Sequence, residues 1–145
     1  MMAKLMSAKS FLYFAWLVSI IATLGSLYFS EVKEFIPCEL CWYQRIFMYP
    51  LTFILGIAVY FNDFKVVRYV LPLSIIGGCI SIYHYLIQKI PSFGAITPCK
   101  DGIPCNMQYI NWFGFITIPF LALTAFTLIT IFLFIVLRKE AKKPD

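Results

Sequence analysis

Hydrophobic and polar positions divide this chain into four long apolar stretches separated by short polar segments. The stretches cover residues 11–29, 42–61, 69–90 and 112–137, and a helix needs about 20 apolar residues to cross the hydrocarbon core of a bilayer. Spanning strands would be about 10 residues long and would alternate polar with apolar positions, which these stretches do not. The pattern therefore predicts four membrane-spanning helices.

The composition supports one membrane-embedded unit. Of the 145 residues, 61% are hydrophobic and only 13% are charged, which is too apolar for an ordinary soluble domain and too short for several domains. We expect an all-α fold, an integral membrane four-helix bundle that forms a single domain over residues 1–145. The longer connections, residues 30–41 and 91–111, would lie together on one side of the membrane.

Positively charged residues in the short connections predict which side that is, because cytoplasmic loops carry an excess of Lys and Arg. The larger group comprises Lys4, Lys9, Lys65, Arg68, Arg138, Lys139, Lys142 and Lys143, and the smaller group comprises Lys33, Lys89 and Lys100. This distribution predicts a cytoplasmic N-terminus and C-terminus, and it places both longer connections outside. The net charge of +5 marks helix ends rather than a basic face, so we expect no nucleic-acid binding.

The cysteines fall into two groups according to their predicted position relative to the membrane. Four of the five lie in or beside the outer connections, namely Cys38, Cys41, Cys99 and Cys105. Disulfides persist outside the cytoplasm, so these four predict two disulfides. Of the three possible connectivities, the short spacings favour Cys38–Cys41 and Cys99–Cys105. Cys79 lies in the middle of the third stretch, where we expect a small buried residue with an inert thiol.

The Cys38/Cys41 pair has the spacing of a redox pair rather than a structural one. A disulfide across two intervening residues closes a very small loop, which stabilises a fold least. A C-x-x-C pair opens and closes easily, and a helix N-terminus and a nearby cation lower thiol pKa values. Pro37 precedes the motif, and the second helix is predicted to begin at or just after it. We therefore interpret both cysteines as catalytic.

Apart from Lys89 at the end of the third stretch, Arg45 is the one Asp, Glu, Lys or Arg residue within the four stretches. On a helix, Cys38, Cys41 and Arg45 share one face. A charged side chain costs roughly 2.5 kcal/mol or more at the bilayer midplane, so an arginine here indicates a function. The structural alternatives are snorkelling to the interface and pairing with Glu39 or a phosphate. A thiolate or a reduced quinone oxygen would give the guanidinium an anionic partner, and this interpretation is favoured.

Two further features suggest a relay to a membrane acceptor. The segment around Cys99 and Cys105 is rich in Gly and Pro, which is typical of exposed turns that another protein can reach. A thiol–disulfide relay needs an accessible cysteine pair as well as a protected one. The alternative is that a Cys99–Cys105 disulfide only stabilises the loop.

His84, the only histidine, lies near the outer end of the third stretch and could donate to a quinone carbonyl or move a proton. The alternative is that His84 has no role at a quinone and only packs between the helices.

These features together resemble the DsbB family of disulfide bond formation proteins, most closely its BdbC branch. The resemblance covers residues 11–137, through the four spans, the motif Cys38-Glu-Leu-Cys41-Trp-Tyr-Gln-Arg45 and the cysteine pair before the fourth span. It implies that Cys41 contacts a quinone as the thiolate, that Cys38 is its disulfide partner, and that Arg45 and His84 lie near the quinone. Menaquinone is favoured over ubiquinone.

The resemblance also implies a partner and a location. Cys99 and Cys105 would reoxidise an extracytoplasmic thioredoxin-like oxidase of the DsbA or BdbD type. The protein would lie in the cytoplasmic membrane as a multi-pass protein, with its redox cysteines on the outer face.

The expected function is thus that of a thiol–disulfide oxidoreductase, which supports disulfide formation in exported proteins and transfers the electrons to a membrane quinone. Three other readings remain. A vitamin K epoxide reductase-like enzyme also couples cysteine pairs to a quinone, but its pairs resemble these in the reverse order. A thiolate metal-binding membrane protein would need further ligands across the bilayer, and we expect no resident metal. A structural subunit would use its disulfides only for stability.

Overall fold

The computed structural model describes residues 2–90, Ser92 and residues 111–142, with side chains from residue 8 onward. It contains four long helices, α1 (Met2–Leu27), α2 (Glu39–Phe61), α3 (Val67–Lys89) and α4 (Ile118–Ala141). Each of the four has a segment long and apolar enough to cross a membrane. No strand occurs in this part of the chain, apart from one isolated bridge between Trp112 and Ile116. The expected all-α four-helix fold is confirmed.

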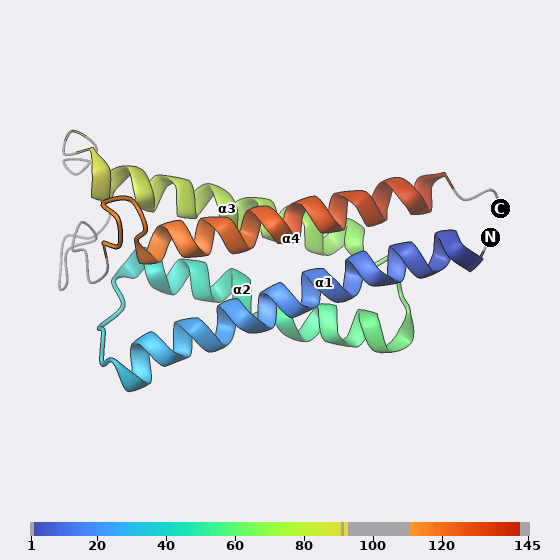
Figure 1. Cartoon of the computed structure of the whole chain (residues 1–145), viewed down its shortest axis with the longest axis horizontal. Coiled ribbons are helices and arrows are strands. Elements are labelled where there is room, and N and C mark those ends of the chain that lie inside the picture. The colour runs from blue at the N-terminus through green and yellow to red at the C-terminus, as the bar shows by residue number, and fades with distance from the viewer. Residues whose placement is uncertain (1, 91, 93–110, 143–145) are drawn as a thin grey trace.

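The helices alternate in direction along the bundle (Figure 1). Both termini lie at one end together with the α2–α3 turn, and the α1–α2 connection and the segment that precedes α4 lie at the other end. We call the second end the Cys38 end, because Cys38 immediately precedes α2. The α1–α2 connection, the end of α3 and the start of α4 therefore share one end of the molecule, as the alternation of spans requires.

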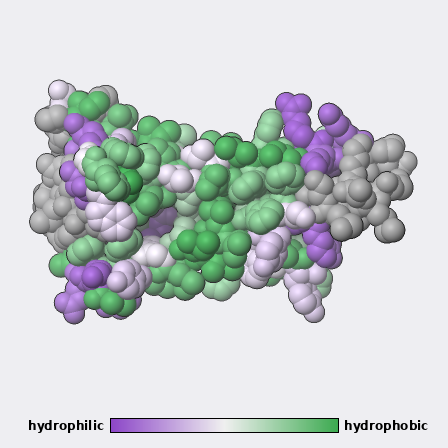
Figure 2. All heavy atoms as spheres, in the orientation of Figure 1, coloured by the Kyte–Doolittle hydropathy of each residue, from purple (hydrophilic) through white to green (hydrophobic). Residues whose placement is uncertain are grey.

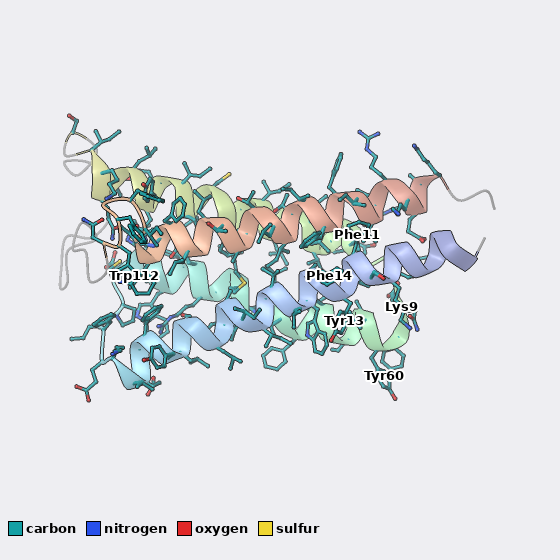
Figure 3. All side chains as sticks on the ribbon, viewed as in Figure 1. Lys9, Phe11, Tyr13, Phe14, Tyr60 and Trp112 are labelled. Atoms are coloured by element: carbon teal, nitrogen blue, oxygen red, sulfur yellow. The ribbon has the colours of Figure 1, made fainter. Side chains whose placement is uncertain are left out.

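The outer surface of the bundle is apolar along most of its length. Large hydrophobic side chains such as Phe53 and Ile57 are 74% and 61% exposed, and hydrophilic residues gather toward the two ends (Figure 2). Trp112 lies at the Cys38 end, whereas Lys9 and Tyr60 lie toward the end with the termini (Figure 3). Such a surface suits lipid rather than water, and the chain is a multi-pass membrane protein.

Hydroxyl groups link the helices inside the bundle. The hydroxyls of Thr23 and Thr52 lie 2.8 Å apart between α1 and α2, and those of Ser74 and Thr130 lie 2.8 Å apart between α3 and α4. In a membrane such bonds add to close packing, at about 0.6 kcal/mol each. Helices α3 and α4 pack tightly where Gly77 faces the ring of Phe126, because a Cβ atom at Gly77 would overlap that ring.

The helix ends differ from the predicted spans at both sides of the site. The second helix begins at Glu39 rather than residue 42, so Cys41 lies within its first turn. The fourth begins at Ile118 rather than residue 112, because Phe113 and Gly114 have φ values of 54° and 82°. That turn reverses the chain and closes with hydrogen bonds between Trp112 and Ile116.

Two further observations change the expected picture of single elements. The first span continues past α1 into a π-helical turn, η1 (Tyr28–Val32). The expectation that Cys79 is buried is wrong, because its side chain is exposed on the surface of α3. In a membrane protein a small apolar side chain can face lipid without cost, so apolarity did not predict burial here.

The Gly77–Phe126 contact yields a stability prediction. Gly77→Ala should lower the unfolding free energy by about 1–3 kcal/mol, since the added methyl group overpacks the α3–α4 interface. Gly78→Ala is the matched control, because its Cβ would meet Phe126 only at 3.6 Å. Denaturation in detergent micelles, followed by circular dichroism, measures both. Equal stability of the two variants would contradict the tight contact.

Candidate functional site

The Cys38/Cys41 pair lies where the chain enters α2. Pro37 precedes it, Cys38 is extended as the N-cap residue, and its carbonyl accepts the first helical hydrogen bond from the Trp42 N–H at 3.1 Å. Winding the helix from this point brings the two Sγ atoms within 3.5 Å of each other. Both are free thiols here, and only a small movement separates them from the S–S bond length of about 2.05 Å.

His84 of α3 packs directly against this pair. Its Nε2 atom lies 3.6 Å from Cys38 Sγ, across 46 residues of sequence. Both side chains are almost completely buried, at 1% and 8% exposure. The contact forms a thiol–imidazole pair, the arrangement that lets a histidine take or return a thiol proton.

These neighbours lower the pKa of Cys38 to about 4. The hydrogen bond with the Cys41 thiol lowers this pKa most, and the hydrogen bond and positive charge of His84 lower it further. Burial acts in the opposite direction but is outweighed. These contacts therefore favour the thiolate form of Cys38 in the reduced protein, and the thiolate at Cys41 that the family resemblance implied stays a prediction.

Arg45 is held by the end of α1. Its Nε donates to Ser26 Oγ at 2.9 Å and its Nη2 to the Ser26 carbonyl at 3.1 Å, and its guanidinium lies 5.3 Å from the ring centroid of Trp42. The described contacts of Arg45 thus run to α1 and to Trp42, rather than to the Glu39 carboxylate that its sequence position also allowed.

A cavity of about 440 Å³ adjoins these groups. Its walls are largely apolar and come from all four helices and the α1–α2 connection, and they include Cys38, Cys41, Gln44, Arg45, His84 and Gln88. On the α1 side the wall runs from Val18 to Ser30, and on the α4 side from Ile118 to Leu128. Both cysteines and Arg45 therefore face one apolar space, as their helical spacing predicts.

The cavity lies where α1 and α4 separate. Toward the termini the two helices touch through the rings of Phe11, Phe14 and Phe132. They diverge toward the Cys38 end (Figure 1), and the cavity occupies the space between their diverging halves, against α2 and α3.

Sequence reasoning missed two polar residues of the site. Ser26 is the hydrogen-bond partner of Arg45, but a serine in a span carries no signal of its own. Gln44 is buried and donates to Ser81 of α3 at 3.1 Å. Its signal was available, because Gln44 is an amide inside a span and directly precedes Arg45 in the C-x-x-C-x-x-Q-R motif.

The predicted second pair, Cys99 and Cys105, lies outside the described residues, so its disulfide and its redox role stay predictions. The roles given to Cys38, Cys41, Arg45 and His84 likewise stay predictions. What the structure adds is that these four residues lie together on one cavity.

Comparison with known proteins gives the chain clear relatives. Residues 8–136 match the family model described as disulfide bond formation protein DsbB. The chain is 68% identical to disulfide bond formation protein C of Bacillus subtilis, over 85% of this chain and 89% of the relative. It is 57% identical to probable disulfide formation protein C 1 of Bacillus cereus, over 89% and 93%. No solved structure matches it with significance.

A less similar relative is also covered over most of its length. The chain is 50% identical to a probable disulfide formation protein of Coxiella burnetii, over 92% of this chain and 90% of the relative. The similarity therefore extends along nearly the whole chain, through all four helices.

The lowered pKa of Cys38 predicts an unusual pH profile for alkylation of the reduced protein. A thiol with an ordinary pKa of about 8.5 loses thiolate, and hence reactivity, roughly tenfold per pH unit below that value. Cys38 should keep nearly its full alkylation rate from about pH 8 to about pH 6, because its pKa lies below this window. Iodoacetamide labelling followed by peptide mass spectrometry measures the rate.

N-acetylcysteine in the same reaction provides the control for reagent chemistry. His84→Ala should move the Cys38 profile to higher pH, since it removes two contributions that lower the pKa. A Cys38 profile parallel to that of N-acetylcysteine would contradict the thiolate assignment.

Proposed function

The chain belongs to the DsbB family of disulfide bond formation proteins, and from that premise we propose that it passes electrons from an extracytoplasmic dithiol protein to a membrane quinone. Family membership supports the coarser statement, a membrane disulfide oxidoreductase. The observation that carries the finer one is the Cys38/Cys41 dithiol on the wall of an apolar cavity that also holds Arg45.

The cavity has the properties that a quinone ring requires. Its volume of about 440 Å³ lies within the range of roughly 300–1,000 Å³ for small-molecule sites, and a few polar groups stand in apolar walls. Arg45 and Gln44 offer N–H donors for the ring oxygens. The separation of α1 from α4 gives an apolar tail a path toward lipid, so the acceptor need not leave the membrane.

The proposed reaction starts with thiol–disulfide exchange. A reduced partner dithiol attacks the Cys99–Cys105 disulfide, and the resulting thiols reduce the Cys38–Cys41 disulfide. The Cys38/Cys41 pair then re-forms its S–S bond and gives up two electrons, and the pair together with His84, which holds the proton that Cys38 has released, gives up two protons; a bound quinone would take up both to become a quinol. In total, partner dithiol plus quinone gives partner disulfide plus quinol.

Each residue of the site has a part in the last step. Cys41, on the same face of α2 as Arg45, delivers the electron pair, and Cys38 closes the disulfide on it. Before that step, Cys41 passes its proton to Cys38 across their 3.5 Å contact. His84 gives its own proton toward the acceptor and then takes the proton of Cys38 as the S–S bond forms. Arg45 stabilises the negative charge that develops on the acceptor oxygen.

The distribution of Lys and Arg supports one orientation of the molecule in the membrane. We propose that the end with the termini is cytoplasmic, since Lys9, Lys65, Arg68, Arg138, Lys139 and Lys142 gather there. The Cys38 end then faces the exterior, where disulfides persist. A thioredoxin-like oxidase of the DsbA or BdbD type is the proposed partner, and menaquinone is the proposed acceptor, which rests on the likeness to the BdbC branch.

A different observation counts against each alternative function. A vitamin K epoxide reductase-like enzyme fits the quinone but not the order of the cysteine pairs along the chain. A metal carrier would need ligand groups along a path, whereas the one group of potential ligands in the described part of the chain is Cys38, Cys41 and His84 at a single end.

Turnover with purified protein tests the proposal. Incubated with a reduced thioredoxin-like dithiol protein and a short-chain quinone, the protein should reduce the quinone, followed by its absorbance. Changing any one of Cys38, Cys41, Cys99 or Cys105 to Ser should abolish this turnover, because each breaks the relay. Cys79→Ser, on the exposed surface of α3, should leave the rate unchanged. Full turnover by Cys41→Ser would refute the proposed route.

The Ser26–Arg45 contact makes a second, finer prediction. Arg45→Ala should raise the KM for quinone by about tenfold or more, since a hydrogen bond to a charged group contributes about 1.5–3 kcal/mol. Ser26→Ala should raise this KM only a few-fold, because Arg45 keeps its bond to the Ser26 carbonyl. In the double variant the two effects should not add, as expected for residues that act through one contact.

Ser19→Ala is the matched control for this series. Ser19 also lies on α1, but its hydroxyl donates to the Trp16 carbonyl of its own helix at 2.6 Å. Its KM should match the wild type. If Ser26→Ala and Ser19→Ala had the same KM, Ser26 would not position Arg45.

A further inference from the structure

The reduced site brings three metal-binding atoms together. The Sγ atoms of Cys38 and Cys41 lie 3.5 Å apart, and Nε2 of His84 lies 3.6 Å from Cys38 Sγ. All three atoms are within 4.8 Å of one another. The sequence pattern did not indicate this cluster, because the two cysteines lie at the start of α2 whereas His84 lies in α3.

These distances match the edges of a tetrahedral zinc site. With Zn–S bonds of about 2.3 Å and Zn–N bonds of about 2.0–2.1 Å, tetrahedral angles put two sulfurs about 3.8 Å apart and a sulfur and a nitrogen about 3.5 Å apart. The two measured separations of 3.5 and 3.6 Å need only a few tenths of an ångström of adjustment. The third edge, between Cys41 and His84, is at most 4.8 Å long, compared with about 3.5 Å for a sulfur and a nitrogen in a tetrahedral site.

We propose that the reduced dithiol and His84 form a three-ligand site for Zn²⁺, which holds the protein in its reduced state. Two thiolates and one imidazole are ligands that borderline-soft, tetrahedral cations prefer. All three residues line the cavity, so the fourth coordination position opens into it and is available to water or another small ligand. The site exists only while the S–S bond is open.

Binding is an exchange of protons for metal, without electron transfer. A dithiol with both protons releases two protons as Zn²⁺ binds, and a dithiol already present as one thiolate releases one. Apparent affinity therefore rises with pH. The sulfurs are then no longer nucleophiles, so electrons cannot leave for an acceptor. This last consequence rests on the proposed function, whereas the binding itself does not.

Metal titration of the full-length protein tests the binding. The variant Cys79→Ser/Cys99→Ser/Cys105→Ser removes every other thiol of the chain. Reduced, it should bind one equivalent of Zn²⁺, measured by competition with a chromogenic chelator; oxidised with diamide, it should bind none. Co²⁺ in place of Zn²⁺ should give the intense visible bands of a tetrahedral site and a sulfur-to-metal charge-transfer band in the near ultraviolet.

Ligand variants in this background locate the site. His84→Ala should weaken Zn²⁺ binding by about tenfold or more, since even loss of an outer partner of a ligand typically costs 10–100-fold. Cys38→Ser should abolish the charge-transfer intensity or halve it. Ser81→Ala is the control on the same helix, because Ser81 bonds Gln44 rather than the thiols. Thermal unfolding in micelles verifies that each variant is folded.

Two outcomes would overturn the proposal. One is equal Zn²⁺ binding by the reduced and oxidised proteins, and the other is Zn²⁺ affinity that His84→Ala leaves unchanged. Turnover of the wild type then separates this inference from the proposed function. Zn²⁺ should stop quinone reduction and a chelator should restore it, whereas absence of turnover without any metal would count against the proposed function alone.

Discussion

A guanidinium inside a membrane span has to be hydrogen-bonded, and the way this chain satisfies Arg45 organises its whole Cys38 end. Two of the five N–H donors of Arg45 bond Ser26, one to its hydroxyl and one to its backbone carbonyl. That carbonyl lies just before the π-helical turn Tyr28–Val32, and π-turns of this kind recur at functional sites. One contact therefore fixes the end of α1 against the first turns of α2, which carry both cysteines.

The same contact determines the shape of the cavity. Aromatic rings hold α1 against α4 near the termini, whereas at the Cys38 end Arg45 ties α1 to α2. The two helices consequently diverge where the cysteines lie (Figure 1). The α3 helix closes the opposite side, since Gln44 bonds Ser81 and His84 contacts Cys38. A thiol pair, a cation and an apolar space thereby meet at one end of the bundle.

Two levels of this structure could be predicted from the sequence. Four apolar stretches predict four helices, because the bilayer fixes both their length and their composition. The pairing of Cys38 and Cys41 with Arg45 also follows from the sequence, since helical periodicity places them on one face. What could not be predicted is contact between helices. The Cys38–His84 and Arg45–Ser26 contacts depend on how far each helix is rotated and tilted, and spacing along the chain does not determine that.

The misplaced boundaries have local causes. The segment Trp112-Phe-Gly-Phe is as apolar as a span, so hydropathy assigned it to the fourth helix, yet the positive φ of Phe113 and Gly114 makes it a turn. Gly114 was the available signal. Cys79 shows the reverse failure, since a residue that would be buried in a soluble protein can face lipid here.

The central claim is that the space beside Cys41 and Arg45 is where the membrane acceptor reacts, and photolabelling with an azido-quinone tests it most directly. After irradiation and digestion, the label should lie on residues 18–30 of α1 and η1, on the first turns of α2, and on residues 118–128 of α4. Excess unmodified quinone should prevent the labelling. Label concentrated instead around Ile54, Phe61 and Val66, which line a smaller cavity at the opposite end, would contradict the account.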